Sequence, residues 1–262
     1  MTITFYKYQG TGNDFIIIDN RQRIISKNDT KKVARLCDRK FGIGADGLML
    51  LEKSEDPKDD FKMVYFNADG NESSMCGNGG RCLVAFAHKL GIITDTATFT
   101  AVDGKHYATI KDFIVNLQMQ DVTTVDIFES HVFLDTGSPH HISLVDDVAM
   151  LDVVAIGKGI RNGAPYFETG TNVNFVEQKA SNHYKVRTYE RGVEDETLSC
   201  GTGVTAAALA MHATNRTSDN RIRIDTLGGE LQVSFTTTNN GQYTDVILSG
   251  PAVFVFKGVI EW

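Results

Sequence analysis

The sequence predicts an α+β protein in which strands surround a buried central helix, once in each half of the chain. Three observations lead to this prediction. Apolar residues alternate with period two along much of the chain, hairpin turns separate these stretches, and few segments have a helical pattern. A Cys-Gly-x-Gly pattern also occurs twice, at residues 76–79 and 200–203, each time at the start of an apolar helical run.

The strand segments show their pattern plainly. "FIVNLQM" at 113–119 and "ELQVSF" at 230–235 place every second apolar side chain on one face. Asp103-Gly104 and Asn240-Gly241 lie inside such stretches and are typical of tight hairpin turns. Most connections are therefore predicted to be antiparallel, and "SGPAVFVFKGVIEW" at the carboxyl end reads as one or two further strands.

Three segments are predicted to be helical. "DTKKVARLCDRKFG" begins with Asp29 as a cap and is predicted to stop at Gly42. "NGGRCLVAFAHKLG" runs from the first cysteine motif to Gly91, and "TGVTAAALAMHAT" follows the second. This last segment is apolar nearly all round, which favours a helix enclosed by other elements.

Composition limits the function classes. The 262 residues carry a formal charge of -7 with no basic cluster, which argues against a nucleic-acid-binding surface. No apolar run is long enough to span a bilayer, and the amino terminus lacks the apolar core of a signal peptide. We therefore expect a cytoplasmic protein. Its 4 cysteines should be reduced there, which favours thiol chemistry over a disulfide scaffold.

The two halves resemble each other beyond the cysteines. "GTGNDF" at 10–15 is similar to "GTNVNF" at 170–175, and each precedes its own Cys-Gly-x-Gly. This similarity indicates a duplication. We place the boundary within "IVNLQM", so that residues 1–116 form the first domain and 117–249 the second.

The start of a helix favours the thiolate form of a cysteine. The positive end of the helix dipole stabilises negative charge there and lowers the pKa of a thiol. The glycines that follow leave the first backbone N–H groups approachable, and such groups bind anions. Each motif thus offers a thiol beside a site for a carboxylate.

The sequence also allows other interpretations of these motifs. Cys37, on an apolar helix stripe, and Cys82 are interpreted as buried apolar residues, the commonest state of an intracellular cysteine. Cys76 and Cys82 lie too far apart for a zinc knuckle, and no second pair exists, so no metal site is expected. "GTGVTA" at 201–206 matches a dinucleotide-binding pattern, but no buried strand precedes it.

Polar residues near the two motifs suggest a small zwitterionic substrate. Asparagines occur in glycine-rich turns and at strand ends, where side chains can converge on a ligand. Arg191 could hold a carboxylate through two parallel hydrogen bonds.

Taken together, "KYQGTGNDFIIID", "FNADGNESSMCGNGGRC", "GTNVNF" and "YERGVEDETLSCGTG" closely resemble the diaminopimelate epimerases, from residue 5 to about 256. The resemblance implies two pseudo-symmetric domains, each a barrel-like sheet around its helix, with the active site in the cleft between them. It implies that the last strand, within 250–262, returns to the first domain. It also implies epimerisation of diaminopimelate without pyridoxal phosphate or another cofactor, and a homodimer.

The family's site residues are carried over one by one. The resemblance makes Cys76 and Cys200 the paired acid and base, with His140 and Glu190 associated with these thiols. Asn13, Asn67, Asn172 and Arg191 match positions that hold the distal amino-acid end of the substrate. Gly77, Asn78, Gly201 and Thr202 match the helix starts that hold the reacting α-carboxylate.

The chain departs from the family's pattern at two positions. Ser138 replaces the usual asparagine, which predicts a weaker or water-mediated distal contact. Gly47 stands where some members carry glutamine, and that contact is expected to be missing.

Proline racemases and hydroxyproline epimerases, which share this fold, are the alternative. They typically show histidine where this chain has Asn78, and a cyclic substrate has no distal carboxylate for Arg191. A thiol redox sensor or a nicotinamide-binding protein is the alternative from another class, and stoichiometric cofactor binding would favour it.

Overall fold

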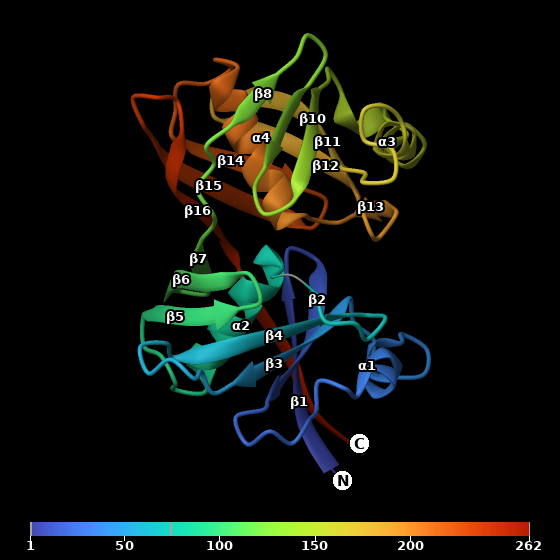
Figure 1. The fold of residues 1–262 in the computed structure, drawn as a ribbon, viewed down its shortest axis with the longest axis vertical. Coiled ribbons are helices and arrows are strands. Elements are labelled where there is room, and N and C mark those ends of the chain that lie inside the picture. Colours follow the sequence, from blue (N-terminus) through green and yellow to red (C-terminus); the bar gives the residue numbers. More distant parts are fainter. Residues whose placement is uncertain (1, 74, 262) are drawn as a thin grey trace. The chain divides into compact units, whose positions relative to one another are not determined.

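The computed structural model describes residues 2–73 and 75–261, and the chain forms two compact units (Figure 1). The first unit comprises Met1–Leu117 and Gly250–Trp262, and the second comprises Gln118–Ser249. That these units are also independent domains stays a prediction.

The described residues of the first unit form eight strands and two helices. Its strands are β1 (Thr2–Gly10), β2 (Asn13–Asp19), β3 (Gly47–Glu52), β4 (Phe61–Asn67), β5 (Thr96–Ala101), β6 (Gly104–Lys111), β7 (Ile114–Gln118) and β17 (Val253–Glu261). Its helices are α1 (Thr30–Cys37) and α2 (Gly77–Lys89). The strands pair in the order β17-β1-β2-β3-β4-β5-β6-β7, and only β2–β3 and β4–β5 are parallel.

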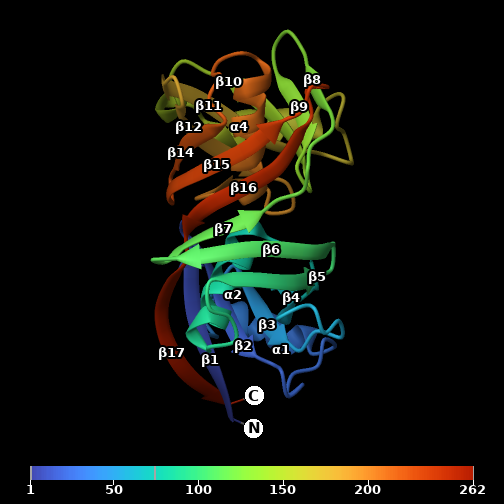
Figure 2. The same cartoon turned by 90° about the vertical axis from the view of Figure 1, so that its left-hand side faces the viewer.

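Helix α2 lies inside this curved sheet and contacts β1, β2, β3, β6 and β17 (Figures 1 and 2). Every residue from Gly77 to Ala87 is buried, because strands surround the helix on all sides. Helix α1 lies outside the sheet and packs Val33, Leu36 and Cys37 against the apolar side chains of β2 and β3. The first cysteine motif is therefore at the start of an enclosed helix.

The second unit repeats this plan. Its strands are β8 (Val125–Ile127), β9 (Val132–Asp135), β10 (Pro139–Leu144), β11 (Asn172–Ala180), β12 (His183–Glu190), β13 (Asp195–Thr197), β14 (Arg221–Thr226), β15 (Gly229–Thr237) and β16 (Tyr243–Pro251). Its helices are η1 (Val148–Met150), α3 (Val153–Asn162) and α4 (Gly201–Ala213). Helix α4 is the enclosed one and contacts β9, β10, β11, β12, β14 and β15, whereas α3 packs outside on β11 and β12 (Figure 1).

The strand pairings of the two units follow the same pattern. In the second unit the order is β8-β9-β10-β11-β12-β14-β15-β16, with β10–β11 and β12–β14 parallel. β2 therefore corresponds to β10, and β3 to β11. This correspondence corrects the motif alignment made from the sequence: "GTGNDF" leads into β2, whereas "GTNVNF" leads into β11. The counterpart of Thr11-Gly12-Asn13 is Thr136-Gly137-Ser138, and both glycines have positive φ, at 85° and 100°.

The predicted α+β class and both hairpins are confirmed, since β5–β6 and β15–β16 are antiparallel pairs. The predicted end of the first helix is wrong. Helix α1 ends at Cys37 rather than at Gly42, because Asp38 has extended backbone and its carboxylate accepts hydrogen bonds from the N–H groups of Lys40 and Phe41. Helix α3 was not predicted.

Candidate active site

Both motif cysteines are the N-cap residues of the enclosed helices. Cys76 has φ −102° and ψ 123° before α2, and Cys200 has φ −117° and ψ 113° before α4. In the described part of the chain, neither side chain makes a capping hydrogen bond to its helix. The first-turn N–H groups have no partner within a helix, so each start can hold an anion beside a sulfur atom.

The second glycine of each motif lies close to other atoms, most closely at Gly203. A Cβ atom on Gly203 would lie 2.3 Å from Oδ1 of Asn174 and 3.4 Å from the Cβ of Cys200. A Cβ atom on Gly79 would lie 3.1 Å from Sδ of Met49 and 3.5 Å from the Cβ of Cys76. Glycine at this position therefore leaves room for the cysteine and the residue behind it.

Two predicted asparagines meet at the first cysteine. Oδ1 of Asn13 accepts from the Cys76 thiol at 3.5 Å and from Nδ2 of Asn78 at 3.4 Å. The other end of the Asn13 amide donates from Nδ2 to Oδ2 of Asp46 at 2.6 Å, which fixes its orientation. The structure thus brings Asn13, Asn78 and Cys76 together. The sequence prediction placed Asn13 with the distal end of the substrate, and that role stays a prediction.

A charge network supports the strand that carries Asn13. Asp14 forms ion pairs with Lys7 at 2.7 Å and with Arg39 at 2.6 Å, and Arg39 also pairs with Asp46 at 2.7 Å. Burial alone would raise the pKa of Asp14, but the hydrogen bonds from Arg39 and Lys7 outweigh it and lower the pKa to about 2. The charged Asp14 is therefore part of what holds β1, β2 and the Asn13 turn together.

Replacing Asp14 by asparagine is expected to lower the free energy of unfolding by about 1–2 kcal/mol near neutral pH, since Arg39 is 59% exposed and solvent weakens its share. A carboxyl whose pKa is lowered by folding stabilises the protein above its ordinary pKa of 3.8, and the effect disappears as pH falls through about 2. Urea unfolding followed by circular dichroism should therefore show the two proteins converging across this range. A constant difference down to the lowest pH would contradict this account.

The second cysteine has hydroxyl neighbours. Sγ of Cys200 lies 3.4 Å from Oγ1 of Thr202, and Oγ1 of Thr136 donates to the carbonyl oxygen of Thr202 at 2.9 Å. The loop that ends β9 is thereby tied to the first turn of α4.

His140 is fully buried in β10, and Asn174 determines its tautomer. Nδ2 of Asn174 donates to Nδ1 of His140 at 3.0 Å, while Oδ1 of Asn174 accepts from Thr188 at 2.9 Å. Nδ1 is thus an acceptor, so the ring proton is on Nε2, which has no hydrogen-bond partner among the described residues. Burial lowers the pKa of His140 to about 3, with a smaller effect from Arg191, so the ring is neutral at physiological pH. Sequence reasoning missed Asn174; its place two residues after Asn172 on one strand face was the available signal.

The predicted distal residues of the second unit form a cluster. Oδ1 of Asn172 accepts from the backbone N–H of Arg191 at 2.9 Å, and its Nδ2 donates to Oγ of Ser138 at 2.9 Å. The Arg191 guanidinium donates to the carbonyl oxygen of Thr169 at 3.0 Å and to Ser138 at 3.5 Å. The replacement at position 138 therefore keeps a hydrogen-bonding group beside Arg191. Next to this cluster, Oε2 of Glu190 accepts from Thr197 at 2.9 Å.

Gly47, the first residue of β3, pairs with Asn67, the last residue of β4. Asn67 is exposed, and its carbonyl oxygen accepts from Gly70 at 2.9 Å. A Cβ atom on Gly47 would lie 2.5 Å from the ring of Tyr65 and 2.9 Å from its hydroxyl. Tyr65 thus fills the space that a longer side chain at position 47 would need.

The two other cysteines lie in apolar surroundings. Burial raises the pKa of both Cys37 and Cys82 to about 12, so each remains a protonated thiol. This agrees with their interpretation as buried apolar residues.

Within residues 2–73 and 75–261, no group of three or more metal-ligating side chains is placed to hold an ion. No helix in the same part of the chain has the length and apolar character needed to cross a membrane.

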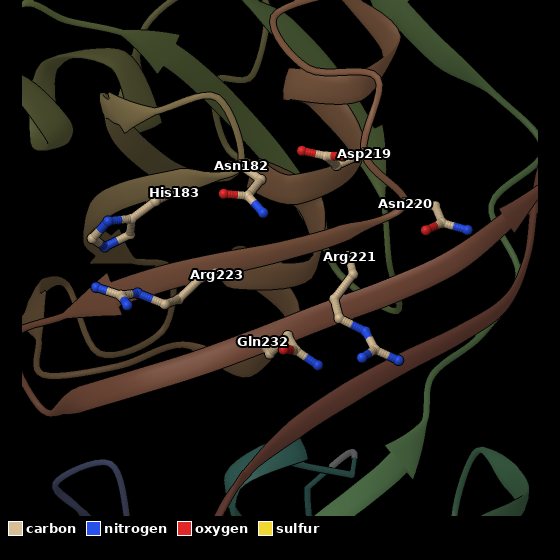
Figure 3. Close-up of a pocket in the computed structure, with 7 residues that line it drawn as sticks. All are labelled: Asn182, His183, Asp219, Asn220, Arg221, Arg223 and Gln232. Carbon is tan, nitrogen blue, oxygen red and sulfur yellow. The ribbon is translucent and has the colours of Figure 1, made fainter.

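A surface pocket of about 350 Å³ lies on β12, β14 and β15 and contains none of the predicted site residues (Figure 3). It is lined by Asn182, His183, Asp219, Asn220, Arg221, Arg223 and Gln232. Two of its side chains, His183 and Arg223, already contact Asp225 and Glu230, and we assign no site there.

The fold is shared with solved structures of low sequence identity. A phenazine biosynthesis protein of the PhzF family from Bacillus anthracis superposes with a TM-score of 0.80 at 13% identity, covering 100% of both chains. A hydroxyproline epimerase from Agrobacterium vitis, with bound trans-4-hydroxy-L-proline, gives 0.71 at 15% identity, covering 99% of this chain and 92% of the other. At these identities the likeness concerns the fold alone.

The sequence comparisons are more specific. The family model described as diaminopimelate epimerase matches residues 5–125 and 132–255. The diaminopimelate epimerase of Flavobacterium psychrophilum is 56% identical over 256 residues, covering 97% of this chain and 99% of the relative. That of Chlorobaculum tepidum is 43% identical, covering 96% and 98%. With the paired cysteine motifs at two enclosed helix starts, these matches show that the chain belongs to the diaminopimelate epimerase family.

Proposed function

We propose that this protein interconverts LL- and meso-2,6-diaminopimelate without a cofactor, supplying lysine and peptidoglycan synthesis. The observation that carries the choice of substrate is the cluster of Arg191, Asn172 and Ser138. A guanidinium fork held in this way suits a second carboxylate, which diaminopimelate has and proline lacks. The names of the relatives at 56% and 43% identity support the same choice.

The proposed reaction removes the α-proton from one face of the α-carbon and adds a proton from the other cysteine to the opposite face. The thiolate of one cysteine removes the α-proton, and the electron pair of the broken C–H bond moves toward the α-carboxylate. The thiol of the other cysteine then donates its proton to the opposite face, and the two roles exchange in the reverse direction. The N–H groups of Gly77, Asn78, Gly201 and Thr202 would stabilise the charge that develops on the carboxylate.

The test is a comparison of substrates. Purified protein with a thiol reductant is incubated separately with LL-diaminopimelate, L-proline and trans-4-hydroxy-L-proline, and the isomers are separated by chiral chromatography. We expect turnover of diaminopimelate alone. The Cys76→Ala variant, purified in parallel, controls for epimerase carried over from the expression host. Turnover of either proline, with none of diaminopimelate, would overturn the proposal.

The proline-type epimerase is retained as the second candidate because the hydroxyproline epimerase shares the fold at a TM-score of 0.71. The same three incubations decide between the two. A homodimer and a cytoplasmic location stay predictions, and sedimentation of the purified protein and fractionation of the producing cell test them.

A further inference from the structure

Arg81, in the second turn of α2, is a fully buried cation at the first cysteine motif. Its Nη2 donates to Oδ1 of Asn78 at 3.0 Å and to Oγ1 of Thr11 at 3.4 Å, and its Nη1 donates to the carbonyl oxygen of Gly77 at 3.4 Å. Its Nε is buried without a hydrogen-bond partner among the described residues. Every acceptor that it has is a neutral group.

The charge of Arg81 is therefore not balanced by a carboxylate. No ion pair of Arg81 occurs within residues 2–73 and 75–261. A guanidinium stays protonated in a protein, and an unpaired buried charge is strongly unfavourable. A negative charge near Arg81 would therefore stabilise this arrangement.

The groups around Arg81 leave one internal candidate for that anion. Burial lowers the pKa of Arg81, and negative charge on Cys82 or Cys76 would act in the opposite direction. Cys82 is excluded because burial raises its pKa to about 12. Cys76 is only partly buried and is at the helix start, where a thiolate is favoured.

The other groups near Cys76 do not balance the cation. Beyond Asn13 lie two acids, Asp14 and Asp46, and two bases, Lys7 and Arg39, whose charges cancel. The Oδ1 atom of Asn13 faces the sulfur at 3.5 Å and favours the protonated thiol. A neutral dipole interacts with a thiolate more weakly than a full positive charge does at a similar distance.

The second unit shows that the structural contacts of Arg81 do not require a charge. The residue at the same place in the second motif is Thr205, whose Oγ1 donates to the carbonyl oxygen of Gly201 at 2.9 Å. Arg81 makes the corresponding contact with Gly77. The loop residue Thr136, the counterpart of Thr11, bonds directly to the carbonyl oxygen of Thr202. The positive charge of Arg81 is thus a difference between the two motifs that these contacts do not require.

We propose that Arg81 is a positioning residue that makes the two thiols unequal, stabilising Cys76 as the thiolate of the substrate-free protein while Cys200 remains the thiol. It acts through space on the sulfur and through Asn78, whose Oδ1 it holds so that Nδ2 faces Asn13. Its consequence for the reaction rests on the proposed function: the isomer whose α-proton faces Cys76 is the one that the resting protein can deprotonate directly.

The test measures each thiol separately, without substrate. Initial rates of iodoacetamide alkylation are followed across the pH range, and the peptides containing Cys76 and Cys200 are quantified by mass spectrometry. In the unsubstituted protein, the midpoint of the pH profile should be lower for Cys76 than for Cys200. Because midpoints rather than rates are compared, the different exposure of the two sulfur atoms does not affect the result. A lower or equal midpoint for Cys200 would overturn the proposal.

Two variants separate charge from packing. Arg81→Met keeps most of the volume and should reduce the alkylation rate of Cys76 near neutral pH about tenfold, because the thiolate fraction falls. Arg81→Lys keeps the charge and should restore most of that rate, and Cys200 should be unaffected in both. Equal changes at both cysteines would indicate general loosening and contradict the proposal, as would an unchanged Cys76 profile in folded Arg81→Met.

If Arg81→Met does not fold, the alkylation profiles of the unsubstituted protein and of Arg81→Lys still test the proposal. A Cys76 midpoint that is not lower than the Cys200 midpoint would overturn it. Since no amino acid is added, failure of this test is distinct from failure of the substrate assay.

Discussion

Replacing either Cys76 or Cys200 by alanine is expected to reduce epimerisation by at least about a thousandfold, because positioned general acids and bases contribute this much to proton transfer. Inversion needs a base on one face of the carbon and an acid on the other, so neither cysteine can replace its partner. The rate is measured from the appearance of the second isomer by chiral chromatography. One variant is still expected to exchange the α-proton of a single isomer, since a single base is enough for exchange.

The matched control is Cys37→Ala, which removes a cysteine that is buried in α1 and has its pKa raised to about 12. Its activity should stay close to that of the unsubstituted protein. In heavy water, early product should carry deuterium at the α-carbon while recovered substrate stays largely protiated, since each thiol serves one face. Near-normal epimerisation by Cys76→Ala would mean that the two-base account is wrong.

Arg191→Lys is expected to raise KM for diaminopimelate by tens-fold, given about 1.5–3 kcal/mol for a hydrogen bond to a charged group. The guanidinium offers two parallel donors in a fixed plane, whereas an ammonium is a point charge on a flexible chain. Asn172 holds the backbone of Arg191, and Ser138 and Thr169 contact its donors, so its fork is positioned before any ligand arrives. Steady-state kinetics with LL-diaminopimelate measure the change.

Arg161→Lys is the control for this variant. Arg161 is also in the second unit, where it pairs with Glu194 at 3.0 Å and belongs to the outer helix α3. Its replacement should leave KM unchanged. If Arg191→Lys also had an unchanged KM, the distal carboxylate would have to bind elsewhere.

Local patterns in the sequence were enough to predict the features that depend on near neighbours. The two Cys-Gly-x-Gly motifs predicted two helix starts. This prediction depends only on residues that are adjacent in the chain, because the anion-binding N–H groups at a helix start belong to the motif itself. The apolar run after Cys200 predicted an enclosed helix, and the Asp-Gly and Asn-Gly turns predicted two hairpins. The resemblance in these motifs also predicted the family.

The tertiary structure determined the contacts between residues that are far apart in the chain. Only strand pairing shows that Thr11-Gly12-Asn13 corresponds to Thr136-Gly137-Ser138, because the register depends on long-range partners rather than on local similarity.

The same holds for the polar contacts of the site. Asn13 meets Cys76, Asn174 sets the tautomer of His140, and Arg81 is buried with no carboxylate partner among residues 2–73 and 75–261. In the sequence, each of these residues could equally be a surface or turn residue. Burial and pairing determine the charge and the hydrogen-bonding role of a polar side chain, and both depend on the surrounding fold. The sequence therefore determined which groups can carry the chemistry, and the fold decided which of them are held beside each thiol.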